Sequence, residues 1–372
     1  MGTLHADPNG QLSLGYEDQV LYNFAAQKDT FGYNLLTFNT AEYNAFTLLW
    51  RLLKIRKTEK RVYVIHYELV KFWPPIFAAL FYLLAPILLR DSRSKIVYFY
   101  HGPLVKRISL HQASLYSGSI RSLQGLAPIT FFLLYNRMLR RFTKHFVDLV
   151  VTFVPSHCEF FKPRSVLIDH GTPTSNRGND HIANYDAISP EFLTFFGAIS
   201  PRKSITTILP AVAAASKSLG LKVLMMGEVS PYFKGYRETL DRVARENGQE
   251  LLWESIRHCD FLKRIKFLSK SVVIIPYLTD QTPVYSMFDV LAFTHRVLVL
   301  SNADTRNSLP SFISTSEKHC LIVPDGANDA PEMMNRIRDL SEGRSKVEFS
   351  EPLPSIPECL APIFRTVFGQ PN

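Results

Sequence analysis

The fold is decided by one stretch, residues 271–302, which reads SVVIIPYLTDQTPVYSMFDVLAFTHRVLVLSN. Residues 271–276 and 296–300 are runs of β-branched and aliphatic residues too short for a helical period, so each predicts a strand. The polar run at residues 280–285 contains Pro283, which cannot donate to a sheet, and residues 286–293 predict a helix of about two turns. A helix that begins after a strand presents unpaired N–H groups and the positive end of its dipole. The stretch therefore predicts a parallel α/β sheet with an anion site at this loop.

Predicted strands alternate with helical stretches along the whole chain, which is typical of βα units and mostly parallel sheets. The polar run at residues 171–190, GTPTSNRGNDHIANYDAISP, has no apolar periodicity and marks a domain boundary. We therefore predict an α/β chain of two doubly wound Rossmann-like domains, residues 1–180 and 181–350, and a final segment, 351–372, with a helix at 354–368. The other predicted strands are residues 33–39, 61–66, 95–100, 148–154, 165–169, 192–197, 221–227, 250–253 and 320–323.

The composition of the 372 residues narrows the class of protein. Hydrophobic residues make up 46% and charged residues 20%, which describes a globular chain and excludes a disordered one. The net charge of +9 favours a negatively charged partner such as lipid, nucleotide phosphate or nucleic acid. No recognised nucleic-acid module with exposed aromatic residues is present, so we expect no nucleic-acid partner. The first 30 residues lack a basic start with an apolar core, which favours a cytoplasmic location.

The first half contains an unusually apolar run, FWPPIFAALFYLLAPILL at residues 72–89. Its length allows a membrane span, although three prolines would interrupt a spanning helix. A buried core helix and a helix whose apolar face enters a bilayer surface are the alternatives. Nearby basic residues, among them Arg90, Arg93 and Lys95, favour the surface-bound alternative, because an anionic leaflet attracts basic residues beside an apolar face.

Three segments in the second half resemble the donor-binding domain of GT-B glycosyltransferases, in particular glycosyltransferase family four. They are FFGAISPRKS at residues 195–204, KVLMMGE at 222–228 and PYLTDQTPVYSMFDVLAF at 276–293. The segments ESIRHCDFLKRIKFLS at 254–269 and PYLTDQTPVY at 276–285 are also similar to the membrane-associated glucuronosyltransferases of xanthan synthesis. A weaker likeness extends to KIVYFYHG at 95–102 and LIDHGTP at 167–173. The resemblance implies the GT-B fold, with its two domains facing each other across a cleft, and a nucleotide-sugar donor, for which we expect a UDP-sugar. It also implies that the final segment, 351–372, returns to the N-terminal domain.

The resemblance also implies where the donor would bind. A diphosphate needs cations and bare N–H groups, which Arg202 and Lys203 before a predicted helix would provide. Gly227 at a strand end would let the backbone approach the ligand, and Asp289 would accept hydrogen bonds from the ribose hydroxyls. Each position also has a structural interpretation as a turn or a solvated helix residue. Three further candidates for contact with the sugar, diphosphate or base are Tyr277, Gln281 and Tyr285.

Two departures from the family pattern bear on the mechanism. Ala198 stands where the family carries an arginine after the glycine, and Gln281 stands in place of a carboxylate. The second change favours inversion over retention, and an inverting transfer needs a general base. His101 after a predicted strand is the first candidate, with an imidazole that titrates near neutral pH, and Glu68 is the reserve. A lone histidine after a strand can also be purely structural.

The sequence as a whole predicts a peripheral, monotopic glycosyltransferase on the cytoplasmic face of a membrane. Its N-terminal domain would bind the membrane and a lipid-linked or membrane-held acceptor in surface polysaccharide or glycan synthesis. No Asp-x-Asp motif is present, so we expect no metal and no other cofactor. The alternatives are a GT-B nucleotide-sugar epimerase and a degenerate, non-catalytic GT-B scaffold.

Overall fold

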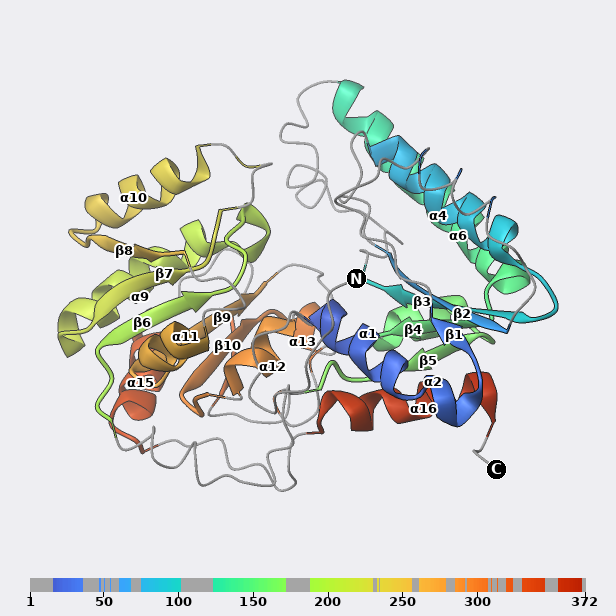
Figure 1. Cartoon of the computed structure of the whole chain (residues 1–372). Helices are drawn as coiled ribbons and strands as arrows, with labels where there is room; N and C mark the ends of the chain where they lie inside the picture. Colours follow the sequence, from blue (N-terminus) through green and yellow to red (C-terminus); the bar gives the residue numbers. More distant parts are fainter. Residues whose placement is uncertain are drawn as a thin grey trace. The chain divides into compact units, whose positions relative to one another are not determined.

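The structure is a computed structural model that divides into two compact units (Figure 1). Unit 1 is Met1–Tyr16 with His170–Ile356, and unit 2 is Glu17–Asp169 with Pro357–Asn372. The boundary near the middle of the chain thus falls between Asp169 and His170. The structure describes residues 16–35, 47, 50, 54, 60–67, 75–101, 123–171, 188–229, 233, 235–255, 261–278, 285–291, 293–306, 309, 313, 319–323, 330–344 and 354–369.

Unit 2 contains one sheet in the order β1-β2-β3-β4-β5, and every neighbouring pair is parallel. These described strands follow the order of the chain without a reversal. Helices precede, connect and follow them, as βα units require. The elements are α1 (Tyr16–Ala26), α2 (Lys28–Phe31), β1 (Asn34–Leu35), β2 (Arg61–Tyr67), α4 (Pro75–Leu89), β3 (Ser94–Tyr100), α6 (Leu123–Phe146), β4 (Leu149–Thr152), α7 (Pro155–Phe161), β5 (Ser165–Leu167) and α16 (Ile356–Phe368).

Alternating side chains of β3 serve the two faces of this sheet. Tyr98 and Tyr100 belong to the core formed with α4, α6 and α7, and the Tyr98 hydroxyl donates to the carbonyl of Tyr82 on α4 at 2.5 Å. Phe99 points to the other face, where its ring lies 6.3 Å from Phe24 of α1. Phe24 in turn lies 4.7 Å from Phe364 of α16, so the last helix of the chain packs on unit 2 beside α1 (Figure 1). The period of two along a buried strand explains this division.

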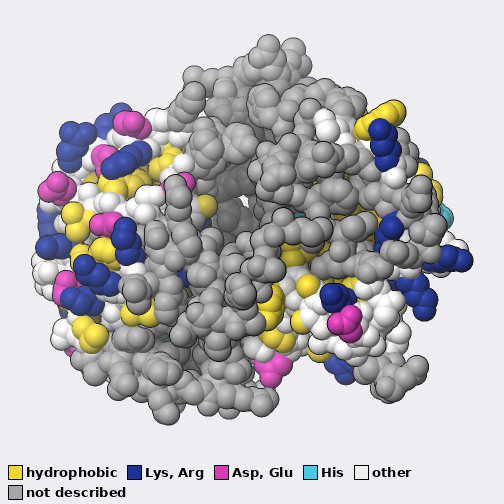
Figure 2. Space-filling view, viewed as in Figure 1, with side chains coloured by type: hydrophobic (Ala, Val, Ile, Leu, Met, Phe, Trp, Pro, Cys, Tyr) yellow, Lys and Arg dark blue, Asp and Glu magenta, His cyan; other side chains and the backbone are white. Residues whose placement is uncertain are grey.

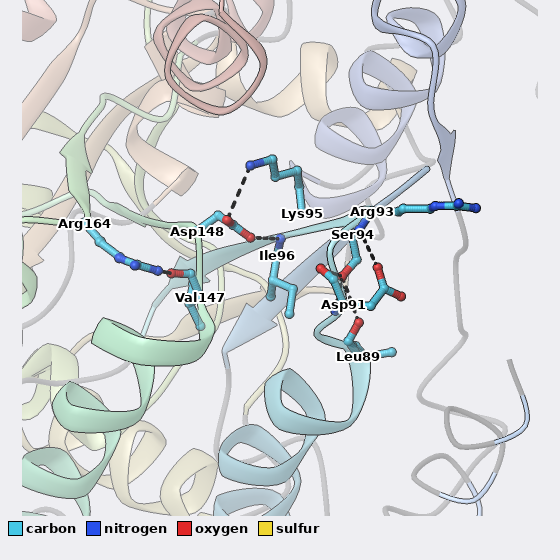
Figure 3. A network of polar contacts seen from close by, with 9 residues as sticks. All are labelled: Leu89, Asp91, Arg93, Ser94, Lys95, Ile96, Val147, Asp148 and Arg164. Carbon is cyan, nitrogen blue, oxygen red and sulfur yellow. Dashed lines mark hydrogen bonds and ion pairs between the residues drawn. The ribbon is translucent and has the colours of Figure 1, made fainter. Parts of the chain in front are cut away.

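The amino ends of β3 and β4 are held by a polar network (Figure 3). The carboxylate of Asp148 accepts from the Ile96 N–H at 2.8 Å and lies 3.6 Å from the Lys95 ammonium. The Arg164 guanidinium donates to the carbonyl of Val147 at 2.5 Å. These contacts fix strand ends opposite the edge where ligands bind in parallel sheets, so we assign them a structural role.

Unit 1 contains a six-stranded parallel sheet in the order β11-β10-β9-β6-β7-β8. The order reverses between β6 and β9, which is the doubly wound Rossmann arrangement with its topological switch point. The elements are β6 (Phe192–Phe196), the 3₁₀ turn η2 (Pro201–Lys203), α9 (Ile205–Leu219), β7 (Lys222–Met226), α10 (Tyr236–Glu246), β8 (Leu251–Glu254), α11 (Phe261–Leu268), β9 (Ser271–Tyr277), α12 (Tyr285–Leu291), β10 (Val297–Ser301), α13 (Ala303–Arg306), β11 (Cys320–Ile322) and α15 (Ala330–Ser341).

Helices cover both faces of the sheet in unit 1 (Figure 1). Val272 and Ile274 of β9 pack in a core with α9, α10 and α15, whereas Val273 and Ile275 pack in a second core with α11 and α12. All seven residues of β9 are buried. Because β9 is buried on both faces, residues 272–276 are apolar without a polar alternation.

Each of the eleven predicted strands corresponds to an observed strand, and no bound differs by more than four residues. Of the predicted strand 33–39, residues 36–39 lie outside the described residues. The predicted helix at residues 286–293 is α12, and the one at 354–368 is α16. The apolar run at residues 72–89 contributes α4, of which one face is buried and the other exposes Leu80 and Leu84. Among the helices in the described parts of the chain, none has the length and apolar character to cross a membrane.

Candidate functional site

The carboxyl ends of β6 and β9 flank the switch point of unit 1, where ligands bind in open α/β sheets. Gly197 follows β6 with φ of 87°, a backbone conformation that favours glycine. The chain then continues through η2 to the start of α9 at Ile205. The segment Gly197–Ser204 is therefore the strand-to-helix loop at the edge where a donor would bind.

Gly227 lies against the backbone of Gly197. A Cβ atom on Gly227 would sit 2.0 Å from the Gly197 carbonyl oxygen, so no larger residue fits while that carbonyl keeps its place. Just beyond the glycines the two chains pair again, with a parallel bridge between Ile199 and Val229. Gly227 thus permits a backbone-to-backbone approach within the protein. Its predicted approach to a ligand remains a prediction.

Lys203 is buried at the end of β6. Its ammonium donates to the Phe196 carbonyl at 2.9 Å, and burial lowers the pKa of Lys203 to about 8. At pH 7 the amine is still mainly protonated, because its pKa lies above the pH. Lys203 therefore holds a desolvated positive charge beside the last residue of the switch-point strand.

Ser204, between η2 and α9, was not singled out from the sequence. It is the one described residue other than glycine with a positive φ, 51°, which costs a serine free energy. Its position lets the chain turn directly into α9, a helix of 15 residues that begins close to Lys203. The amino end of such a helix favours anions. No signal in a single sequence separates this serine from an ordinary helix cap.

Tyr277 ends β9 and is only 2% exposed, packed in a core with Met287 and Phe288 of α12. This burial leaves little of its ring for the predicted contact with a base. Asn302 and Thr305, which the sequence did not single out, hold the strand end in place. The Asn302 amide donates to the Leu278 carbonyl at 2.9 Å, and the Thr305 hydroxyl donates to the Tyr277 carbonyl at 2.6 Å.

The remaining donor-site candidates are described in part or not at all. Arg202 lies in η2, and Tyr285 and Asp289 lie in α12, but the structure describes only their backbones. Gln281 and Glu68 lie outside the described residues. The structure thus brings Gly197, Gly227 and Lys203 together where the neighbouring strands β6 and β7 end.

His101 follows β3 in unit 2 and pairs with His66, the penultimate residue of β2. Nε2 of His101 lies 3.3 Å from Nδ1 of His66. The rings are inclined by only 11° and their centroids lie 5.5 Å apart, so they meet edge to edge through these nitrogens. Phe153 stacks on His101 at 4.9 Å, and Phe99 stacks on His66 at 4.8 Å.

This contact constrains the protons of both histidines. A hydrogen bond between two ring nitrogens needs one donor and one acceptor, so the two facing nitrogens share one proton. Either His101 donates from Nε2 to His66, or His66 donates from Nδ1 to His101. The sequence placed His101 at a strand end but did not identify His66 as its partner, because the pairing depends on the register between β2 and β3.

Among the residues that the structure describes, no three or more His, Cys, Asp or Glu side chains lie together as a metal would require.

No protein-family model and no curated protein matches the sequence. Solved structures match it in fold. Anabaena HepE in complex with UDP-glucose matches with a TM-score of 0.50 and 11% identity over 87% of this chain and 78% of HepE. A UDP-forming α,α-trehalose-phosphate synthase from Burkholderia vietnamiensis matches with a TM-score of 0.51 and 10% identity over 86% of this chain and 72% of the synthase.

A third match is TarM from S. aureus, with a TM-score of 0.50 and 13% identity over 79% of this chain and 51% of TarM. Identities this low establish the fold alone. The specific resemblance to family four and to the xanthan glucuronosyltransferases remains a prediction. The predicted fold class is confirmed: the chain has the GT-B fold with two Rossmann-like domains.

Proposed function

We propose that the protein is a glycosyltransferase that moves a sugar from a nucleotide-sugar donor, a UDP-sugar, to an acceptor. The observation that carries this proposal is the buried ammonium of Lys203 at the switch point of unit 1, beside the glycine contact and the start of α9. The leaving group of a nucleotide sugar is a diphosphate, which a desolvated cation and a helix amino end both stabilise. HepE, which matches in fold, was solved with UDP-glucose.

The chemistry proposed for unit 2 uses His101 as the general base of an inverting transfer. Because His66 engages Nε2 of His101, the nitrogen that would take the acceptor's proton is Nδ1. In the reactive form, His101 donates Nε2–H to Nδ1 of His66. That hydrogen bond also stabilises the imidazolium formed after proton transfer, so His66 is a positioning residue in this proposal.

The acceptor is proposed to be lipid-linked or otherwise held at a membrane, with the protein bound peripherally to the cytoplasmic face in surface polysaccharide or glycan synthesis. The support is the exposed apolar and basic side of unit 2 together with the net charge of +9. Side chains and helix ends, without a metal, would balance the diphosphate charge. Asp289 and Arg202 keep their predicted roles on the ribose and the diphosphate.

Donor binding is tested by calorimetric titration of the full chain with UDP, UDP-glucose and the GDP, TDP and CMP analogues. We expect a uridine ligand to bind, and Lys203→Ala to weaken it by about tenfold to a hundredfold, because a hydrogen bond to a charged group contributes about 1.5 to 3 kcal/mol. Lys222→Ala is the matched control, since Lys222 is an exposed lysine at the amino end of a strand in the same sheet. Equal losses in both variants, or no binding by any nucleotide, would contradict the donor site.

The base is tested with a radiolabelled UDP-sugar and a membrane lipid extract as acceptor. We expect His101→Asn to abolish transfer while donor affinity stays unchanged. We expect His66→Asn to lower kcat and alter its pH profile with little change in the KM for the donor. The anomeric configuration of the product distinguishes inversion from retention.

The same assays separate the two alternative functions. Conversion of one nucleotide sugar into another without any acceptor would favour the epimerase. A folded protein that binds no nucleotide, and whose cellular role survives substitution of His101, Gln281 and Asp289, would favour the scaffold.

A further inference from the structure

Two helices of unit 2, α4 and α6, lie side by side over one face of its sheet (Figure 1). Their inward side chains, among them Phe81 and Ala85 of α4 and Tyr135 and Leu139 of α6, join the same core as Tyr98 of β3. The opposite sides of both helices therefore point away from the sheet. This outward surface is not needed for the core of unit 2.

Large apolar side chains occupy that outward surface. Leu80 and Leu84 of α4 are 43% and 40% exposed, and Leu134 and Met138 of α6 are 55% and 47% exposed. Each pair is spaced four residues apart, so each forms a stripe along one side of its helix. Together the two pairs account for four of the nine large hydrophobic residues that are markedly exposed in the described parts of the chain.

Basic residues accompany the apolar stripe. Arg137 and Arg141 of α6 are exposed, and their spacing of three residues from Leu134 and from Met138 puts them on the same side. Neither helix contains an Asp or Glu anywhere in its sequence. In the view of Figure 2, basic and hydrophobic side chains both reach the described surface.

We propose that the α4–α6 outer face, formed by Leu80, Leu84, Leu134, Arg137, Met138 and Arg141, docks on an anionic lipid surface. A helix that lies in the interface of a bilayer contacts both acyl chains and headgroups. The leucines and the methionine would contact the acyl chains, and the arginines would contact the anionic headgroups. The absence of acidic residues from both helices removes the repulsion that such a surface would otherwise cause. This inference deepens the membrane part of the proposed function and does not depend on donor binding or transfer.

The test is sedimentation of the full chain with two vesicle preparations, phosphatidylcholine alone and phosphatidylcholine with phosphatidylglycerol. We expect binding to the phosphatidylglycerol vesicles that weakens as salt increases. Replacing both arginines (Arg137→Gln with Arg141→Gln) should reduce that binding about fivefold per residue. Replacing both apolar residues of α6 (Leu134→Ser with Met138→Ser) should reduce it by more than about tenfold, because their burial in the bilayer is lost.

The matched control is Leu167→Ser with Leu252→Ser. These leucines, on β5 and β8, are 45% and 37% exposed but have no place on α4 or α6, so this variant should bind vesicles as the wild type does. Substitutions at exposed positions change the free energy of unfolding little, and we would check this by thermal unfolding of each variant.

Several results would overturn the proposal. The wild type could fail to sediment with phosphatidylglycerol vesicles, or the two α6 variants could bind as well as the control. A dimer that Leu134→Ser with Met138→Ser converts to a monomer would assign the face to a second copy of the chain. Loss of vesicle binding with intact UDP binding would leave the donor site standing, so the two proposals fail separately.

Discussion

The ammonium of Lys203 is buried and donates to the Phe196 carbonyl. Burial lowers the pKa of Lys203 from 10.5 to about 8, so the unfolded chain binds more protons than the folded chain between these values. Stability therefore rises with pH across that window, and below pH 8 the full cost of the buried ammonium is present.

We expect Lys203→Met to raise the free energy of unfolding at pH 7 by on the order of 2 kcal/mol, since the lost hydrogen bond offsets part of the gain. The gain should shrink toward pH 10. Urea unfolding at both pH values measures it. A variant that is less stable at pH 7 would show that Lys203 is held by more than the Phe196 carbonyl.

The contact between Gly227 and Gly197 admits no side chain. We expect Gly227→Ala to lower the free energy of unfolding by about 3 kcal/mol or more, because the added methyl would displace the Gly197 backbone carbonyl just past the end of β6. Chemical denaturation measures the loss.

Gly220→Ala is the control for backbone conformation. Gly220 ends α9 with φ of 68°, but a Cβ there meets no atom within 4 Å. We therefore expect a cost of only about 1 to 2 kcal/mol, from the left-handed conformation alone. Equal costs at the two glycines would contradict the steric argument.

At the scale of elements, α16 is the informative helix. It follows unit 1 in the chain but contributes Phe364 and Phe368 to a stack of rings with Phe31 and Tyr33 in unit 2. The sequence predicted this helix from its apolar period. The resemblance to the GT-B family implied that this segment returns to the N-terminal domain, and Pro357–Asn372 belong to unit 2. Local pattern does not identify the rings on which the helix packs.

Truncating α16 at its buried ring tests this packing. Phe364→Ala should lower the free energy of unfolding of unit 2 by about 3 to 5 kcal/mol, because it leaves a cavity beside Phe24 and Phe31. Arg365→Ala, at an exposed position of the same helix, should stay within about 0.5 kcal/mol of the wild type. Similar losses in both would mean that helix formation and not ring packing dominates.

At the scale of the whole molecule, each unit has its own core, and we expect two calorimetric unfolding transitions. UDP at a hundredfold excess over its Kd should stabilise the transition of unit 1 by about 2.7 kcal/mol. Phe364→Ala should lower the midpoint temperature of the unit 2 transition. If UDP raises the midpoint temperature of the same transition whose midpoint Phe364→Ala lowers, donor binding does not belong to unit 1 alone.

The sequence by itself determined the eleven strands and their alternation with helices. These follow from local patterns, because a parallel strand buried on both faces must be apolar over its short length. The GT-B fold class came from the resemblance of three segments to that family and not from local pattern. The sequence also predicted two candidate site residues, Lys203 in a strand-to-helix loop and His101 after a strand.

Only the tertiary structure decided what those residues contact. The pairing of His66 with His101 depends on strand register, the contact of Gly227 with Gly197 depends on two separate strand ends, and the burial of Lys203 depends on how its loop closes over Phe196. The same holds for α4, whose uniform apolar sequence gives no sign of which side faces outward. Contacts between residues distant in sequence arise from packing, and packing is a property of the folded chain as a whole.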